Sequence, residues 1–188
     1  MARWQPDAQE RLREAALELY ASRGFEETTV ADIAESVGLT ERTFFRYFSD
    51  KREVLFANSE QLLEAFVAGI DAAGDELPPL AMVAEAVIAG AHLFPDERLA
   101  HSRRRQGVIS ANPELQEREL RKMGALAAGL AGALRSRGIA EPSATLAAES
   151  GVVAFRLSFE AWVDPANTRP LVEIERGMFE RLSALSAG

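Results

Sequence analysis

The chain has 188 residues, 47% hydrophobic and 27% charged, which is typical of a globular protein with one or two domains. It contains no cysteine, which excludes disulfide frameworks, cysteine-ligated metal sites and thiol nucleophiles. The formal net charge of −8 argues against nucleic acid as a partner, unless one local face carries the positive charge.

The N-terminal sequence MARWQPDAQERL has no apolar signal core, and no segment approaches the about 18 apolar residues of a membrane span. We therefore expect a cytoplasmic protein without a membrane partner. Apolar residues recur at three- and four-residue spacing, and no stretch alternates as a strand does. The sequence therefore predicts an all-α fold of about nine helices.

The first predicted helix has Asp7 as its N-cap, with Glu10 in capping-box spacing, and ends at Gly24. A short arm ahead of this helix carries Arg3 and Trp4. Such arms place an arginine in a minor groove or against a phosphate. The alternative is an ordinary chain terminus, and the sequence leaves both open.

Two short helices are predicted within residues 28–51. Thr29 is the expected N-cap of the first, with Asp32 in capping-box spacing. Gly38 ends this helix, since the tight turn that follows needs positive φ, and Thr40 caps the second helix. This order of elements is typical of a helix-turn-helix that binds DNA.

The second of these helices is rich in aromatic and basic residues. Phe44 and Phe48 lie one turn apart and are expected in the core. The other side chains leave aromatic and basic groups on the remaining faces, where they suit base edges and phosphates. Residues 39–52 hold four cations against two anions, so the local charge is positive. The alternative is a structural helix whose aromatic residues pack on neighbours.

Residues 10–56 resemble the DNA-binding head of the TetR family of bacterial one-component regulators, through the segments AALELYASRGFEETTVADIAESVGL and TERTFFRYFSDKREVLF. The resemblance implies that the helix of Phe44 enters the major groove, and that Tyr47 and Lys51 contact phosphates. Phe45 replaces a tyrosine common in the family and offers an apolar contact to a thymine methyl group. The expected DNA contacts are Arg3, Thr29, Thr40, Glu41, Arg42, Thr43, Phe45, Arg46, Tyr47 and Lys51.

A long fourth helix is predicted from Asp50, with Glu53 in a third capping box, to about Ala72. The chain beyond it is alanine-rich. Further helices are expected at residues 80–94, 95–110, 113–137, 142–163 and 170–187. We expect a DNA-binding domain of residues 1–52 and a ligand-binding and dimerisation domain of residues 53–188.

The resemblance also implies a pocket for a small-molecule inducer in the second domain. Arg103, in a run of three arginines, either lies on a solvated face or anchors an anionic ligand such as a carboxylate. His92 is expected as a pocket or core histidine. The residues expected to line the pocket are Val83, Val87, His92, Arg103, Met123, Ala127, Phe155 and Phe159; the alternative is that they only fill the core.

The last two predicted helices have the features of a dimer interface. The first of them carries small residues followed by large aromatic residues, and the second has leucine, isoleucine and methionine residues at near-heptad spacing. The family dimerises through such a four-helix interface. The expected interface residues are Ala148, Gly151, Trp162, Ile174, Met178 and Leu182.

No catalytic site, metal site or cofactor is expected. The only histidines are His92 and His101, and neither follows a glutamate by three residues, as a di-iron bundle requires. Glycine-rich phosphate loops and nucleophile elbows are also missing from the sequence. We expect a ligand-responsive repressor that an inducer releases from a palindromic double-stranded DNA operator. The alternative is a helical adaptor or ligand-binding protein that has lost DNA binding.

Overall fold

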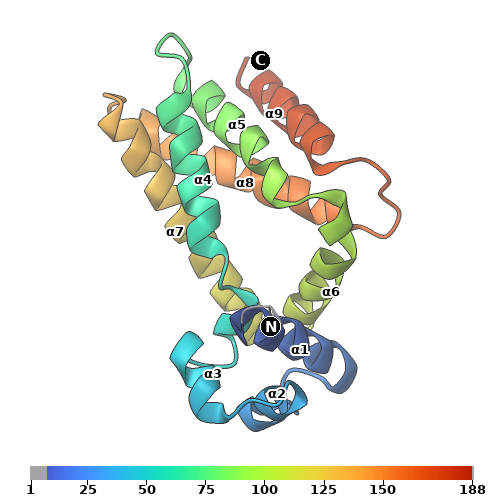
Figure 1. Ribbon diagram of the computed structural model, residues 1–188. Helices are drawn as coiled ribbons and strands as arrows, with labels where there is room; N and C mark the ends of the chain where they lie inside the picture. Colours follow the sequence, from blue (N-terminus) through green and yellow to red (C-terminus); the bar gives the residue numbers. More distant parts are fainter. Residues whose placement is uncertain (1–7, 188) are drawn as a thin grey trace, which may run out of the picture. The chain divides into compact units, whose positions relative to one another are not determined.

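The computed structural model describes residues 8–187, and every regular element in that range is helical (Figure 1). Nine α-helices and three short 3-10 helices follow one another in the described residues, which confirms the predicted all-α class. The chain divides into two compact units. The first unit contains residues 1–57 and 104–117, and the second contains residues 58–103 and 118–188. The functional boundary after residue 52 stays a prediction, because a packing unit is not a functional assignment.

The first unit combines the N-terminal helices with a later piece of the chain. Its elements are α1 (Ala8–Arg23), α2 (Val30–Ser36), α3 (Glu41–Tyr47), the 3-10 helix η1 (Glu53–Leu55), the end of α6 (Leu99–Ser110) and the start of α7 (Pro113–Ser136). Helices α1, α2 and α3 contact one another. Val108, Ile109 and Leu115 from the later piece share one buried apolar cluster with α1 to α3.

The local signals around α2 and α3 are confirmed. Thr29 and Asp32 form a reciprocal capping box, with hydrogen bonds of 2.8 and 3.1 Å to the two backbone N–H groups. Gly38 has a φ of +69°, which L side chains rarely adopt, and so allows the tight turn into α3. Asp7 lies outside the described residues. Glu10 instead forms an ion pair with Arg13 at 2.8 Å.

The prediction of one long helix from Asp50 to Ala72 is wrong. The Asp50 carboxylate accepts the backbone N–H groups of Arg52 and Glu53, at 2.8 and 3.1 Å, and so caps only the short helix η1. Residues 54–56 are all buried in the first unit. Three consecutive buried residues do not fit one face of a surface helix, so the chain turns before α4 (Ser59–Ala72) begins.

The second unit is built around α5 (Pro79–Gly90), which contacts α4, α8 (Ser143–Val163) and α9 (Leu171–Ala187) (Figure 1). Two 3-10 helices, η2 (Ala91–Leu93) and η3 (Asp96–Arg98), connect α5 to α6. The central position of α5 agrees with its buried residues, which are Met82, Val83, Ala86, Val87 and Gly90. Helix α6 passes through Gly107 without interruption.

Glycines allow the helices of the second unit to approach closely. A Cβ atom added at Gly151 of α8 would lie 2.2 Å from Val83 Cγ1, and one at Gly129 of α7 would lie 2.5 Å from Leu63 Cδ1. The glycine at position 129 thus allows α7 to pack closely on α4. Within residues 8–187, none of the helices combines the length and apolar character needed to cross a membrane.

Candidate nucleic-acid interface

Helix α3 separates a buried side from an outward side. Phe44 and Phe48 are buried, with ring centroids 5.2 Å apart, as the sequence predicted. Phe45 packs edge-on against Phe44 but leaves 54% of its surface exposed. The exposed residues of this surface are Thr40, Glu41, Arg42, Phe45 and Arg46, and the half-buried ones are Thr43 and Tyr47. A rigid core therefore supports an outward aromatic and basic surface.

Arg46 and Tyr47 form one combined group on this surface. Arg46 Nη2 donates a hydrogen bond of 2.7 Å to Tyr47 Oη, and the guanidinium carbon lies 4.8 Å from the ring centroid. Cation–π stacking and the hydrogen bond hold the two side chains together. The remaining N–H groups of Arg46 and the O–H group of Tyr47 suit acceptors such as phosphate oxygens.

Two of the threonines expected to contact DNA, Thr29 and Thr40, also act as helix caps. Thr40 Oγ1 accepts the Thr43 N–H at 3.3 Å and lies 3.1 Å from the Thr43 hydroxyl. Thr29 Oγ1 donates to the Asp32 carboxylate at 2.6 Å, and hydrogen bonds from Thr29 lower the pKa of Asp32. Thr29 is therefore engaged in the cap of α2, so a phosphate contact by its hydroxyl would have to replace this bond.

The side chain of Lys51 does not extend freely toward solvent. Its ammonium group donates to the carbonyls of Phe25, Glu26 and Thr28, at 2.9, 3.3 and 3.1 Å. It also lies 4.3 Å from the centroid of the Phe25 ring. All three N–H donors are thus directed at the loop between α1 and α2. The predicted phosphate contact of Lys51 competes with this structural role.

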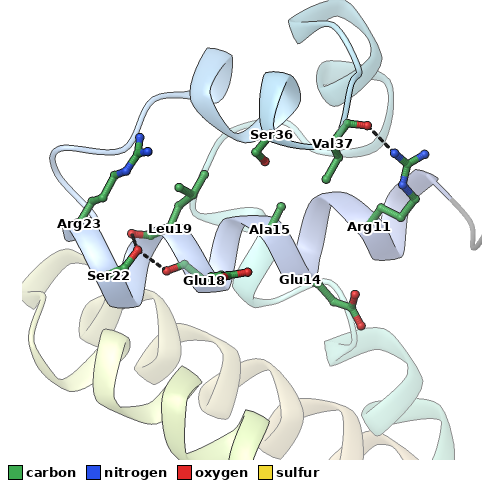
Figure 2. A pocket seen from close by; sticks show the side chains of 9 residues that line it. All are labelled: Arg11, Glu14, Ala15, Glu18, Leu19, Ser22, Arg23, Ser36 and Val37. Atoms are coloured by element: carbon green, nitrogen blue, oxygen red, sulfur yellow. Dashed lines mark hydrogen bonds between the residues drawn. The ribbon is translucent and has the colours of Figure 1, made fainter.

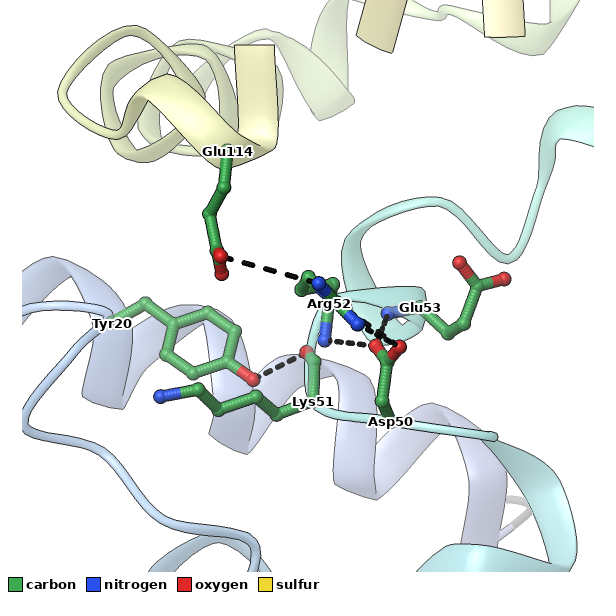
Figure 3. A network of polar contacts seen from close by, with 6 residues as sticks. All are labelled: Tyr20, Asp50, Lys51, Arg52, Glu53 and Glu114. Carbon is green, nitrogen blue, oxygen red and sulfur yellow. Dashed lines mark hydrogen bonds and ion pairs between the residues drawn. The ribbon is translucent and has the colours of Figure 1, made fainter. Parts of the chain in front are cut away.

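Figure 3 shows a polar network beside Lys51 that the sequence did not reveal. Tyr20 Oη donates a 2.6 Å hydrogen bond to the carbonyl of Lys51, and burial, followed by the charge of Asp50, raises the pKa of Tyr20. Asp50 forms an ion pair of 2.8 Å with Arg52, which lies 4.0 Å from Glu114 at the start of α7. These contacts fix the segment that follows α3. From the sequence, Tyr20 could have been predicted only to be a buried aromatic residue of α1, without its hydrogen bond to Lys51.

An open groove lies along α1 where α2 packs on it (Figure 2). Arg11 donates a hydrogen bond to the Val37 carbonyl at one end, and Ser22 Oγ donates to the Glu18 carbonyl at 2.8 Å. The residues that line the groove are Arg11, Glu14, Ala15, Glu18, Leu19, Ser22, Arg23, Ser36 and Val37. Two arginines face two glutamates there, so the groove has no charge preference for DNA.

Most residues expected to line a ligand pocket are brought together in the second unit. Four of them, Val83, Val87, Ala127 and Phe155, are buried in one cluster, with Met123 and Phe159 packed against it. His92 is exposed, and its Nδ1 lies 2.7 Å from the Ala89 carbonyl, so it is not part of this cluster. Arg3 lies outside the described residues.

The structure gives Arg103 a different partner from the predicted anion. Its guanidinium donates to the carbonyls of Val163, Asp164 and Asn167, at 3.2, 2.9 and 3.2 Å, where α8 ends. Cations stabilise the C-terminal end of a helix because they satisfy its last carbonyls. Arg103 is therefore engaged in this cap and offers little to an anionic ligand.

Several residues predicted at a dimer interface are core residues of the single chain. Ala148 and Trp162 have no exposed surface, and Gly151 and Ile174 are also buried, so they leave no area for a second subunit. Met178 and Leu182 are half-buried against the same core. The outward apolar surface of α8 consists instead of Leu146, Val153 and Leu157, at i, i+7 and i+11, and Leu185 of α9 is 82% exposed.

Two family models match the chain. The model described as "Bacterial regulatory proteins, tetR family" matches residues 12–58, and the model described as "MftR C-terminal domain" matches residues 77–186. The first match includes α2 and α3, and the second includes α5 to α9 apart from the last residue of α9. Among the described residues, no three His, Cys, Asp or Glu side chains are grouped as a metal site would need.

Curated relatives match parts of the chain. The transcriptional regulator TcmR of Streptomyces glaucescens is 46% identical over 56 residues, which cover 30% of this chain and 25% of TcmR. The putative mycofactocin biosynthesis regulator MftR of Mycobacterium tuberculosis is 29% identical over 105 residues, covering 56% of this chain and 52% of MftR. The chain thus spans about a quarter to a half of the length of these relatives.

Solved structures share the fold over almost the whole chain. FadR of Bacillus subtilis, in complex with stearoyl-CoA, has a TM-score of 0.63 at 21% identity and covers 92% of this chain and 96% of FadR. A TetR-family regulator of Syntrophomonas wolfei has a TM-score of 0.62 at 18% identity, with 96% and 95% coverage. At these identities the likeness concerns the fold alone.

Proposed function

The chain belongs to the TetR family of bacterial transcriptional regulators, and from this premise we propose that it is a ligand-responsive repressor that binds a double-stranded DNA operator as a homodimer. The observation that carries the proposal is the outward surface of α3, which rests on the buried Phe44 and Phe48. Arg42 is the proposed base-reading residue, because arginine suits the paired acceptors of guanine. An operator in the bacterial chromosome places its site of action in the cytoplasm.

The proposed dimer has a physical reason. The seven residues of α3 reach only a few base pairs, whereas two copies about 34–36 Å apart read half-sites one turn apart. Leu146, Val153 and Leu157 are exposed on one face of α8 and are the proposed contact surface, to which the exposed Leu185 of α9 would add in a four-helix interface. A two-fold dimer then requires a palindromic operator.

The proposed inducer binds in the second unit, among the apolar residues that the buried cluster of α5, α7 and α8 contains. Binding there would favour one arrangement of the dimer over another and so change the separation of the two α3 helices. A ligand shifts such an equilibrium only by its difference in affinity for the two states. No enzymatic activity is part of this proposal.

The test is the affinity for DNA from the region upstream of the gene, measured by fluorescence anisotropy at several salt concentrations. A steep negative slope of log affinity against log salt is expected, since phosphate contacts release counterions. Arg42→Ala should weaken DNA binding by about 1–3 kcal/mol. It should also relax the base preference at the one operator position that Arg42 reads. A flat slope, or no binding, would instead favour the helical adaptor.

A further inference from the structure

A glutamate lies inside the second unit without a partner. Glu175 is on the buried face of α9, where Leu171, Ile174 and Phe179 are also buried. Its relative exposure is 0%, and neither carboxylate oxygen has a hydrogen-bond partner. Burial raises the pKa of Glu175 to about 8. A buried carboxyl group without partners is costly, and natural cores rarely keep one without a use.

Two more buried polar groups without partners lie on the adjoining helix α8. Ser158 and Trp162, one turn apart, both have 0% exposure, and neither Ser158 Oγ nor Trp162 Nε1 has a hydrogen-bond partner. Helices α8 and α9 pack against each other, and Ile174, next to Glu175, shares an apolar cluster with Trp162. The three unsatisfied polar side chains therefore lie on two helices that pack against each other.

Two aromatic rings pack against Trp162. The ring centroid of Phe94 lies 5.4 Å from that of Phe159 and 6.2 Å from that of Trp162, and Phe159 lies 5.6 Å from Trp162. Phe94 and Phe159 are only half-buried, so this group of rings reaches the surface of the unit.

The chemistry of these groups defines the ligand that would satisfy them. Trp162 donates only, Ser158 donates or accepts, and an ionised Glu175 accepts only. Aromatic faces attract cations, tryptophan most strongly, and a carboxylate in a nonpolar site needs a positive partner. We propose that Glu175 and Ser158, together with the ring face of Trp162, form the polar end of the effector site, and that the effector carries an ammonium group. This inference rests on the proposed ligand response.

Other partners fit these groups less well. A metal ion would need further ligands, and no group of three metal-binding side chains exists in residues 8–185. An anion would meet a carboxylate instead of an arginine, because Arg103 is engaged in capping α8. An acyl chain would fill the aromatic space but would leave Glu175 without a partner.

Three probes of similar shape and different charge test the proposal: phenethylammonium, 2-phenylethanol and 3-phenylpropionate. Binding is measured by calorimetry and by Trp162 fluorescence in a Trp4→Phe background, since the chain has two tryptophans. We expect the cation to bind at least about tenfold more tightly than the neutral and anionic probes, as removal of a buried charge partner costs more than this. Equal binding of all three, or no binding of the cation, would overturn the proposal.

Glu175→Gln keeps the size of the side chain but removes the charge and replaces one acceptor oxygen with a donor, and it should abolish the preference for the cation. Glu173→Gln changes an exposed glutamate of the same helix and should leave the preference intact. If Glu175→Gln retains the preference, the proposal is wrong. Ser158→Ala is a second variant, which should weaken binding of the cation without removing its advantage over the other probes.

A failure of the proposed effector site can be distinguished from a failure of the proposed repressor function. DNA affinity of the same protein is measured without any probe. DNA binding without cation binding overturns the effector class alone. If cation binding depends on Glu175 but DNA does not bind, the site stands and the repressor proposal fails.

Discussion

The surroundings of Lys51 in the first unit and the contact between α8 and α9 in the second unit treat their polar groups in opposite ways. In the first unit the Lys51 ammonium meets three carbonyls, and Tyr20 donates to a fourth at 2.6 Å. In the second unit Glu175, Ser158 and Trp162 are fully buried with no partner for their polar atoms. The polar groups that hold the segment after α3 therefore have their partners within the chain, whereas these three buried groups of α8 and α9 do not.

The largest change in stability is expected when a residue on the buried side of α3 is substituted, compared with one on its outward side. Phe44→Ala removes a fully buried ring and should lower the free energy of unfolding by about 3–5 kcal/mol. Phe45→Ala, the matched variant at an exposed ring, should change it by less than about 1 kcal/mol and instead weaken DNA binding. Urea unfolding measures the first quantity and anisotropy the second. Equal losses of stability would show that Phe45 is also structural.

The next effect is a pH dependence of the second unit. The folded-state pKa of Glu175 is about 8, above the ordinary value of 4.5, so between these pH values the folded state holds the extra proton. Stability should therefore fall as pH rises through this window, by up to about 1.4 kcal/mol per pH unit from this group.

Glu175→Gln has no proton to lose there. Its free energy of unfolding relative to the parent should rise by about 2–4 kcal/mol between pH 5 and 8. Urea unfolding at each pH gives this difference, with Glu173→Gln as the control. If the difference in unfolding free energy between Glu175→Gln and the parent stays constant from pH 5 to 8, Glu175 has a polar partner in solution. The contrast with the satisfied polar groups around Lys51 would then disappear.

A smaller effect is expected at Lys51. Lys51→Met leaves three carbonyls without their donor and should cost about 2–3 kcal/mol of unfolding free energy. Arg46→Met, on the exposed surface of α3, should leave stability within about 0.5 kcal/mol while lowering DNA affinity. Were Lys51→Met to lower DNA affinity without any loss of stability, its role would be the phosphate contact alone.

The smallest effect concerns the cap of α2. Thr29→Ala removes the hydroxyl that accepts the Asp32 N–H and should cost about 1 kcal/mol of stability. Thr29→Ser keeps the hydroxyl and should be nearly neutral. Thermal unfolding distinguishes the two. A loss that is the same in both variants would locate the effect in the methyl group instead of the cap.

Local features of the first unit could be read from the sequence because the relevant partners are close along the chain. Thr29 and Asp32 are three residues apart, and the positive φ of Gly38 follows from the turn itself. The error at residues 50–58 arose because Val54 to Phe56 are buried by tertiary packing, which a helical pattern does not report.

The second unit was less predictable for the same reason. The carbonyls that Arg103 contacts lie about sixty residues further along the chain, so no local pattern shows them. Apolar spacing also does not tell a subunit core from an interface, and Ala148 and Trp162, which were predicted at the interface, have no exposed surface in the single chain. Glu175 gave no signal, because a single acid in a helix usually faces solvent.

The composition of the first unit has a consequence for engineering. Val108, Ile109 and Leu115 complete the apolar cluster of α1, α2 and α3, although they lie some fifty residues beyond Ala57. A chimera that transfers only residues 1–57 to another regulator would lose these contacts and expose the matching apolar surface. Exchange of DNA specificity between such proteins therefore requires the transfer of both segments of this unit, residues 1–57 and residues 104–117.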